Sequence, residues 1–303
     1  MEQEIIWNIP MTGYWGYQII VYFWLVGASA GSFVISSLGW VFGIKRFKAI
    51  SFFACNASII LLLVVPAILI HDLGKPFRFW HLMNYVGNWH YSAPMSWGSI
   101  LITTYPVTMI FYSYCIFRKN EAWARLWGLL AVVLAVCTHW YTGVVMELNP
   151  NRELNHTAMA AIIFLTGAFI SGIGFLIVLL WIRNLFVKTD EQRVPGSFFV
   201  ELGKMMAYGV AFDSFLIFSE FLLMFYGSEE EYAILTKVLL GVLAVPYVWM
   251  EIIAGLMLPF LILFSPLGNR VPFVVLSSIL VCIGVFGMRI WWVFGGQFLQ
   301  TFY

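Results

Sequence analysis

The sequence predicts an all-α, polytopic membrane protein in which eight transmembrane helices form two four-helix bundles and both termini lie outside. Composition is the first observation: of the 303 residues, 62% are apolar and only 10% are charged, whereas a soluble domain has about 25% charged residues. The mean hydropathy is +0.89, which excludes a soluble enzyme. The net charge of +1 excludes a nucleic-acid-binding protein, because such proteins carry an excess of basic residues.

Eight long apolar runs are the second observation, because a helix needs about 20 apolar residues to cross the hydrocarbon core. In sequence order the runs cover residues 17–42, 49–70, 97–117, 123–146, 157–182, 202–226, 236–264 and 272–298. Charged or turn-forming segments separate them, and Gly74 and Pro76 are typical of a helix end. The separating segments are residues 45–48, 71–76, 118–121, 149–152, 188–193, 228–231 and 265–270.

The basic residues, the third observation, predict the orientation. Eleven of the 16 lysines and arginines lie near the connections that follow the first, third, fifth and seventh helices, and four lie on the opposite side. Cytoplasmic connections carry the excess of Lys and Arg, so these odd-numbered connections are expected in the cytoplasm and both termini outside. The expected location is the cell membrane.

A faint internal repeat suggests the two bundles. The first helix contains Leu25–Ala28 followed by Gly31 and Ser32, and the fifth contains Leu165–Ala168 followed by Ser171 and Gly172. Small residues at such spacing allow helices to approach closely within lipid. We therefore expect an N-terminal bundle over residues 1–150 and a C-terminal bundle over residues 151–303.

Metal-binding patterns are missing from the sequence. No C-x-x-C motif is present, and the cysteines lie far apart inside apolar runs, so the protein cannot supply the ligands of an iron–sulfur cluster or a zinc site. These cysteines are Cys55, Cys115, Cys137 and Cys282. A haem with two histidine ligands is also not expected, because only His71 and His139 lie near helix ends, and both on the same side.

One set of polar residues gathers near the outer ends of the first, second and fourth helices. Ionisable groups at membrane depth cost several kcal/mol unless they have a partner or a function. The set comprises Gln18, Tyr22, His71, Asp72, Lys75, His139 and Tyr141. Together these side chains offer hydrogen-bond donors, an aromatic wall and a proton acceptor, which a neutral ring with two carbonyl groups requires. For Asp72, a charge pair with Lys75 or Arg78 and a proton-handling role both remain open.

A second polar set lies deeper, in the sixth to eighth helices. Asp213 and Glu220 are seven residues apart and share a helix face, Glu251 lies in the middle of the seventh helix, and Arg289 lies in the eighth. Three carboxylates then accompany one guanidinium, so at least one carboxylate is expected to be protonated. A structural ion pair between Glu220 and Arg289 and a proton path through Asp213, Glu220 and Glu251 are both compatible with this pattern.

Several motifs give the protein a family resemblance. They are Gly27–Gly31, Asp72–Phe79, Ser92–Gly98, Tyr141–Gly143, Gly255–Pro259 and Arg289–Gln297. With these motifs the chain resembles the NrfD/PsrC family, the quinone-binding membrane subunits of polysulfide reductase and related respiratory complexes. The most specific part is Asp-Leu-Gly-Lys-Pro followed, after a short connection, by Ser-Ala-Pro-Met-Ser-Trp-Gly.

The resemblance implies a subunit without haem or iron–sulfur cluster that binds a quinol near the outer face. Electrons would pass to a ferredoxin-like iron–sulfur subunit docked there, and from it to a molybdopterin-type catalytic subunit. The family's quinone-binding tyrosine corresponds to Tyr141, and its acidic residue beside the site corresponds to Asp72. Gln18 and Tyr22 stand where polysulfide reductase has asparagine and histidine, a departure that affects the head-group contacts.

The sequence thus predicts the membrane anchor and quinol-binding subunit of a respiratory oxidoreductase that uses a menaquinol-type quinol, with proton translocation as a possible further activity. Tyr141, Tyr22, Gln18 and His71 would hold the head group, with His139 and Lys75 nearby, and Asp72 would accept a proton. Two other classes remain open. A proton-coupled secondary transporter would use the deep acids and have interrupted helices near the midplane, and a passive assembly anchor would bind no quinone.

Overall fold

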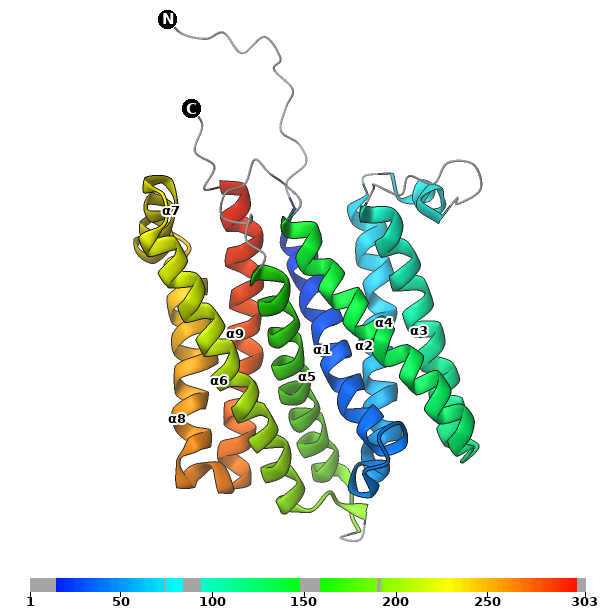
Figure 1. The fold of residues 1–303 in the computed structure, drawn as a ribbon. Helices are drawn as coiled ribbons and strands as arrows, with labels where there is room; N and C mark the ends of the chain where they lie inside the picture. Colours follow the sequence, from blue (N-terminus) through cyan, green and yellow to red (C-terminus); the bar gives the residue numbers. More distant parts are fainter. Residues whose placement is uncertain (1–14, 74, 84–93, 148–158, 190–191, 299–303) are drawn as a thin grey trace, which may run out of the picture.

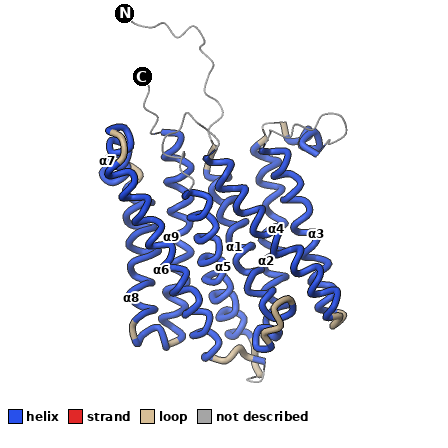
Figure 2. Tube along the Cα trace, viewed as in Figure 1, coloured by secondary structure: helices blue, strands red, loops and turns tan. Residues whose placement is uncertain are grey.

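The computed structural model describes residues 15–73, 75–83, 94–147, 159–189 and 192–298. Within these ranges every regular element is helical, and the long helices run side by side (Figures 1 and 2). The long helices are α1 (Tyr17–Trp40), α2 (Lys48–Asp72), α3 (Pro94–Phe117), α4 (Glu121–Glu147), α5 (Met159–Phe186), α6 (Gly196–Tyr226) and α9 (Val271–Phe298). The shorter elements are η1 (Lys45–Phe47), η2 (Pro76–Met83), α7 (Glu229–Leu240), the π-helix η5 (Val245–Met257), α8 (Leu258–Phe264) and η6 (Pro266–Asn269).

The all-α class and the number of spanning segments are confirmed. Among the residues that the structure describes, eight helical segments are long and apolar enough to cross a membrane. Seven of them agree with the predicted runs to within a few residues. The agreement follows from hydropathy, because only a helix satisfies every backbone group within the segment inside lipid.

The seventh predicted helix, residues 236–264, is wrong in its first part. Residues up to Leu240 belong to the separate helix α7, and the spanning segment begins only at Val245. Helix α7 starts with a capping box, in which the Ser228 side chain accepts from the Glu231 backbone N–H and the Glu231 carboxylate accepts from the Ser228 N–H. It ends at Gly241, whose extended backbone breaks the helix.

Helix α1 lies at the centre of the molecule, where it packs against α2, α4, α5 and α9. The small residues of the suggested repeat meet at the contact between α1 and α5. A Cβ added to Gly31 would lie 2.9 Å from Cα of Gly172, and the Ser32 hydroxyl donates a hydrogen bond of 2.9 Å to the Gly172 carbonyl. The expected close approach of helices at these small residues is therefore confirmed.

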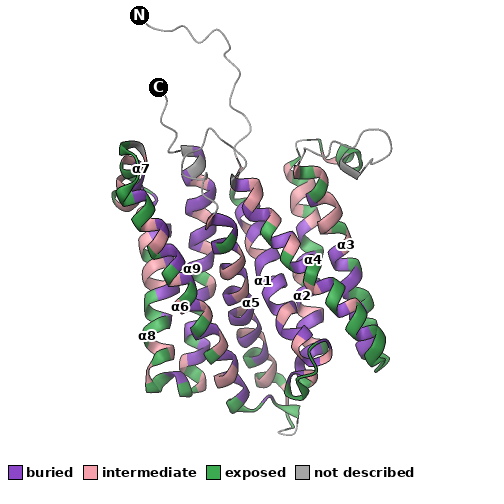
Figure 3. Cartoon of the chain, in the orientation of Figure 1, coloured by how far each residue is buried: buried purple, intermediate pink, exposed green. Residues whose placement is uncertain are grey.

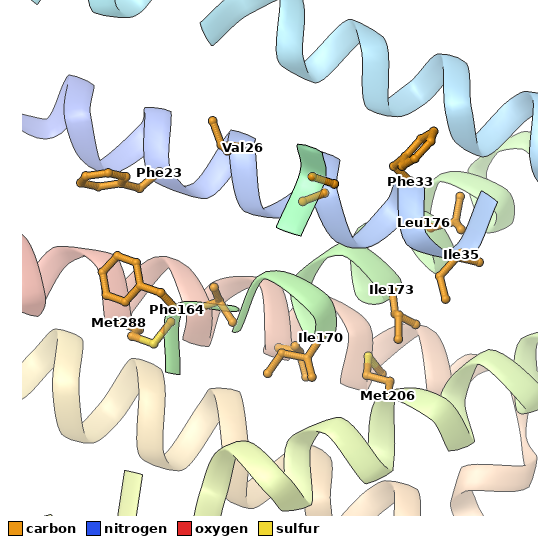
Figure 4. Close-up of a cluster of buried hydrophobic side chains, with 14 of the residues drawn as sticks. Phe23, Val26, Phe33, Ile35, Phe164, Ile170, Ile173, Leu176, Met206 and Met288 are labelled. Atoms are coloured by element: carbon orange, nitrogen blue, oxygen red, sulfur yellow. The ribbon is translucent and has the colours of Figure 1, made fainter. Parts of the chain in front are cut away.

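Burial follows this arrangement. The spanning windows of α1 and α5 are the most buried, and that of the segment through η5 and α8 is the least buried (Figure 3). Figure 4 shows apolar side chains of α1 and α5, among them Phe23, Phe33 and Phe164, together with Met206 of α6 and Met288 of α9. Helices α1, α5 and α9 thus contribute a large part of the buried interior.

The described ends of the spanning helices agree with an even number of crossings. The start of α1 and the end of α9 lie at the same end of the molecule, together with η2 and α7 (Figure 1). The connections rich in Lys and Arg lie at the opposite end, where Arg46 pairs with Glu201 at 2.8 Å. We refer to the end that carries η2 as the η2 end.

Candidate functional site

A cavity of about 700 Å³ lies among helices α1 to α4 near the η2 end. Its wall is mostly apolar, and helix α1 and the ends of α2, α3 and α4 all contribute to it. The lining residues are Trp15, Ile19, Tyr22, Phe23, Pro66, Leu69, Ile70, Asp72, Leu73, Phe79, Met95, Gly98, Ser99, Ile102, Thr103, Pro106, Tyr141, Thr142 and Val145. Ligand cavities of about 300–1,000 Å³ with apolar walls and few polar groups are typical of sites for small organic molecules.

Three predicted site residues line this cavity: Tyr22, Asp72 and Tyr141. They come from three different helices, α1, α2 and α4. Tyr22 is buried against Phe23, with the ring centroids 5.0 Å apart. The cavity therefore combines two phenol groups and one carboxyl group, which can donate or accept hydrogen bonds and accept a proton.

Gly98 has no side chain, and the Tyr141 ring occupies the space that this leaves. A Cβ added to Gly98 would collide with the phenol ring of Tyr141. This glycine closes the Ser92–Gly98 motif, of which Ser92 and Ala93 lie outside the described residues. The close contact of α3 with Tyr141 explains why a residue without a side chain suits this position.

The cavity reaches the lipid-facing surface along α3. Met95 and Thr103 line the cavity, and both side chains are also exposed on the outside of the molecule. Pro66 of α2 and Pro106 of α3 lie in the helix interior at the cavity wall, where each removes one backbone hydrogen bond. An apolar molecule could therefore enter from the bilayer beside α3.

Three other predicted residues, Gln18, His71 and Lys75, do not line the cavity. All three are exposed at the η2 end of the molecule. Gln18 lies on the first turn of α1, His71 in the last turn of α2, and Lys75 just before η2. None of the three is among the residues that line the cavity.

His139 precedes the cavity residue Tyr141 by two positions in the sequence, yet its imidazole ring contacts α5 and α9. Its Nε2 atom is 2.8 Å from the Phe164 carbonyl oxygen and 3.0 Å from Nη2 of Arg289. The same Nη2 atom donates to the Phe164 carbonyl at 3.0 Å, and the guanidinium lies 3.8 Å from the centre of the Phe164 ring. Because the carbonyl can only accept and arginine can only donate, Nε2 makes one of these two hydrogen bonds at a time, and the tautomer of His139 decides which.

The deeper polar set also comes together in space. Asp213 of α6 and Glu251 of η5 line a second, small cavity of about 10 Å³ between α5, α6, η5 and α9. Both carboxylates interact electrostatically with Arg289 of α9. Glu251 is oriented by Trp291, whose indole N–H donates to its Oε2 atom. Glu220 is buried on the same helix as Asp213.

Sequence reasoning missed the contribution of α3 and the contact between His139 and Arg289. Ser99 and Thr103 are four residues apart, so they share a helix face, but uncharged hydroxyl residues are common in any membrane helix.

Within the described ranges, no group of three or more His, Cys, Asp or Glu side chains could hold a metal ion, and all four cysteines are free thiols.

The fold is that of a polytopic α-helical membrane protein with a large, mostly apolar cavity among helices α1 to α4. The chain belongs to the NrfD family, since the family model described as "Polysulphide reductase, NrfD" matches residues 7–300. The resemblance suggested by the motifs is thus confirmed over nearly the whole sequence.

Several relatives support a role in an oxidoreductase complex. The protein is 27% identical to the Hdr-like menaquinol oxidoreductase integral membrane subunit of Archaeoglobus fulgidus, over 98% of its own length and 72% of the relative. It is 27% identical to a polysulfide reductase chain of Wolinella succinogenes, over 93% of its own length and 94% of the relative. It is 24% identical to a selenate reductase subunit of Mesobacillus selenatarsenatis, over 70% of its own length and 57% of the relative. The protein is therefore similar to membrane subunits of reductases that act as complexes.

Proposed function

We propose that this protein is the membrane anchor and quinol-binding subunit of a respiratory oxidoreductase of the sulfur or polysulfide reductase type. The observation that carries the proposal is the cavity of about 700 Å³ lined by Tyr22, Asp72 and Tyr141. Its volume and apolar wall suit a substituted aromatic ring with an isoprenoid tail, and its opening beside α3 suits a lipid-soluble carrier. One relative's name includes menaquinol, which favours a menaquinol-type carrier here.

The three polar residues have different roles at the head group: two bind it, and one accepts a proton. A bound quinol supplies two electrons and two protons. The phenols of Tyr22 and Tyr141 would hydrogen-bond its oxygens and fix the ring, and the Asp72 carboxylate would accept one proton as the electrons leave and, after releasing that proton to water, the second. Asp72 lies at the last position of α2, so a proton that it accepts can pass to the water at the η2 end.

The proposal includes partner subunits. In this proposal the η2 end faces outward and binds an iron–sulfur, ferredoxin-like subunit, which delivers electrons to a molybdopterin-type catalytic subunit. The N-terminal bundle (1–150) holds the quinol, and the C-terminal bundle (151–303) carries the intramembrane acids. Asp213, Glu220, Glu251 and Arg289 then serve proton movement across the membrane.

Two substitutions test the quinol site. Tyr141→Phe and Asp72→Asn are expected to depress quinol-dependent turnover, while the complex still assembles and the iron–sulfur partner still copurifies. Tyr208→Phe on the exposed face of α6 and Glu201→Gln at the opposite end are matched controls. Normal turnover in both site variants would refute the assignment.

Lipid extraction tests the proposal without turnover. The purified complex is expected to carry a stoichiometric quinone, and Tyr141→Phe is expected to lower its content. A complex that assembles fully but contains no quinone would instead support a passive anchor.

A further inference from the structure

The small cavity between α6, η5 and α9 is bordered by two carboxylates that lack a hydrogen-bond partner on one oxygen each. Among the described residues, Oδ1 of Asp213 and Oε1 of Glu251 accept no hydrogen bond. Both side chains are only 2% exposed, and both line the cavity. Buried acceptors of this kind are normally satisfied by a donor, so the two oxygens indicate a ligand that donates to both.

The size of the cavity limits what this ligand can be. About 10 Å³ is roughly the space that a single water molecule needs. Apart from the two carboxylates, the lining consists of Ile170, Gly255, Leu256, Gly284, Val285 and Met288. A hard metal cation takes about six or more oxygen ligands, which this lining cannot supply.

The two carboxylates at the cavity carry more negative charge than the one arginine beside them compensates. Asp213 and Glu251 would together carry two negative charges, and Arg289, which is fully buried, carries one positive charge. An uncompensated charge away from water is costly. Glu220 on α6 adds a further carboxyl group, Tyr247 on η5 interacts with both Glu220 and Glu251, and His139 contacts Arg289 without supplying a fixed charge. None of these neighbours supplies a positive charge, whereas one proton neutralises the excess negative charge of the Asp213–Glu251 pair over Arg289.

The backbone around Glu251 holds its side chain at the cavity. Helix η5 has π-helical geometry, which often marks functional sites. Gly255 and Gly284 let η5 and α9 touch, because a Cβ at Gly255 would lie 2.5 Å from Cα of Gly284. The Trp291 indole holds Oε2 of Glu251, which leaves Oε1 for the cavity.

We propose that Asp213 and Glu251 form an internal proton-binding site, in which the two carboxylates share one proton through a bound water molecule and Arg289 is the counter-ion. No bond other than that of the transferred proton changes when the site loads or unloads. His139 positions the guanidinium through the contact of 3.0 Å, and the turn of α4 that carries His139 also carries Tyr141 and Thr142 of the quinol cavity. The site would hold a proton temporarily during quinol oxidation, and this role rests on the proposed function.

Infrared spectroscopy of the purified complex in lipid, without added quinol, tests the site itself. The wild type is expected to show the carbonyl-stretching band of a protonated carboxyl group, which shifts in heavy water because the shared proton exchanges. Asp213→Asn and Glu251→Gln should each abolish the band, since either variant leaves one carboxylate opposite Arg289 and needs no proton. Glu201→Gln at the surface should leave it unchanged.

Several outcomes overturn the proposal. A wild type without the band, a band that survives both variants, or a band lost in only one of them would each exclude a shared proton. A band that disappears on titration with Na⁺ would instead indicate a metal-ion site. If Glu251→Gln does not assemble, Trp291→Phe removes the donor to Oε2 and should shift the band, and an unshifted band would count equally against the site.

Proton uptake by the complex in vesicles tests the role of the site. Glu251→Gln is expected to lose quinol-driven proton uptake while its quinone content stays at the wild-type level, and Glu251→Asp should restore uptake. Uptake that persists in Glu251→Gln would overturn the role. A wild type without bound quinone would overturn the proposed function instead and would leave the infrared result standing.

Discussion

Gly98→Ala is expected to weaken quinone binding by displacing Tyr141 while leaving the fold intact. The new methyl group would overlap the phenol ring of Tyr141, and this ring is the far end of a side chain that borders the cavity, so it can turn away. The displaced phenol loses its hydrogen bond to the head group, which is worth about 0.5–1.5 kcal/mol net. At about 1.4 kcal/mol per factor of ten, affinity should fall about 2- to 12-fold.

Titration of the purified complex with a fluorescent quinone analogue measures this change, and thermal unfolding shows whether the fold survives. Gly203→Ala is a matched control, because its new Cβ would lie 2.9 Å from the Val274 side chain, away from the quinol cavity. The effect should also disappear in a Tyr141→Phe background, where no phenol hydrogen bond is left to lose. Additive losses of affinity in the double variant would refute the explanation through Tyr141.

Two further predictions concern stability. Ser32→Ala removes the hydrogen bond to the Gly172 carbonyl between α1 and α5 and should destabilise the protein by about 0.6 kcal/mol, a typical value for such bonds in membranes; thermal unfolding should show a lower midpoint than in Ser219→Ala, whose hydroxyl bonds within its own helix. Ser228→Ala removes the cap of α7, which is worth about 1 kcal/mol, so amide exchange within residues 229–240 should accelerate about fivefold while exchange in α5 stays unchanged. Unchanged exchange in α7 would show that the cap contributes nothing to its stability.

The spanning helices could be predicted because hydropathy alone determines which segments enter lipid. The break before the seventh span could not, since Leu239, Leu240, Val242 and Leu243 around Gly241 are as apolar as a spanning helix. A single glycine in such a run is tolerated in many membrane helices. The capping pair Ser228 and Glu231 was the available signal that a new helix starts there.

Of the residues that line the large cavity, the sequence analysis singled out the two tyrosines and the carboxylate but not the wall supplied by α3. Tyr22, Asp72 and Tyr141 stand out because polar groups near membrane depth are rare. The α3 residues Ser99 and Thr103 are uncharged, and their role depends on which helices are neighbours. Neighbour relations arise from the packing of small residues such as Gly31 and Gly172, whose partners a single sequence does not identify.

The different environments of His139 and Tyr141 follow from helix geometry once one of the two is placed. Successive residues of an α-helix are about 100° apart, so positions 139 and 141 differ by about 200° and lie on nearly opposite faces of α4. Tyr141 borders the cavity, and His139 points away from Tyr141 toward α5 and α9, where it contacts Phe164 and Arg289. One turn of α4 therefore contributes to both polar regions, and a shift of this turn that accompanies binding in the cavity would reach the guanidinium of Arg289 through a single side chain.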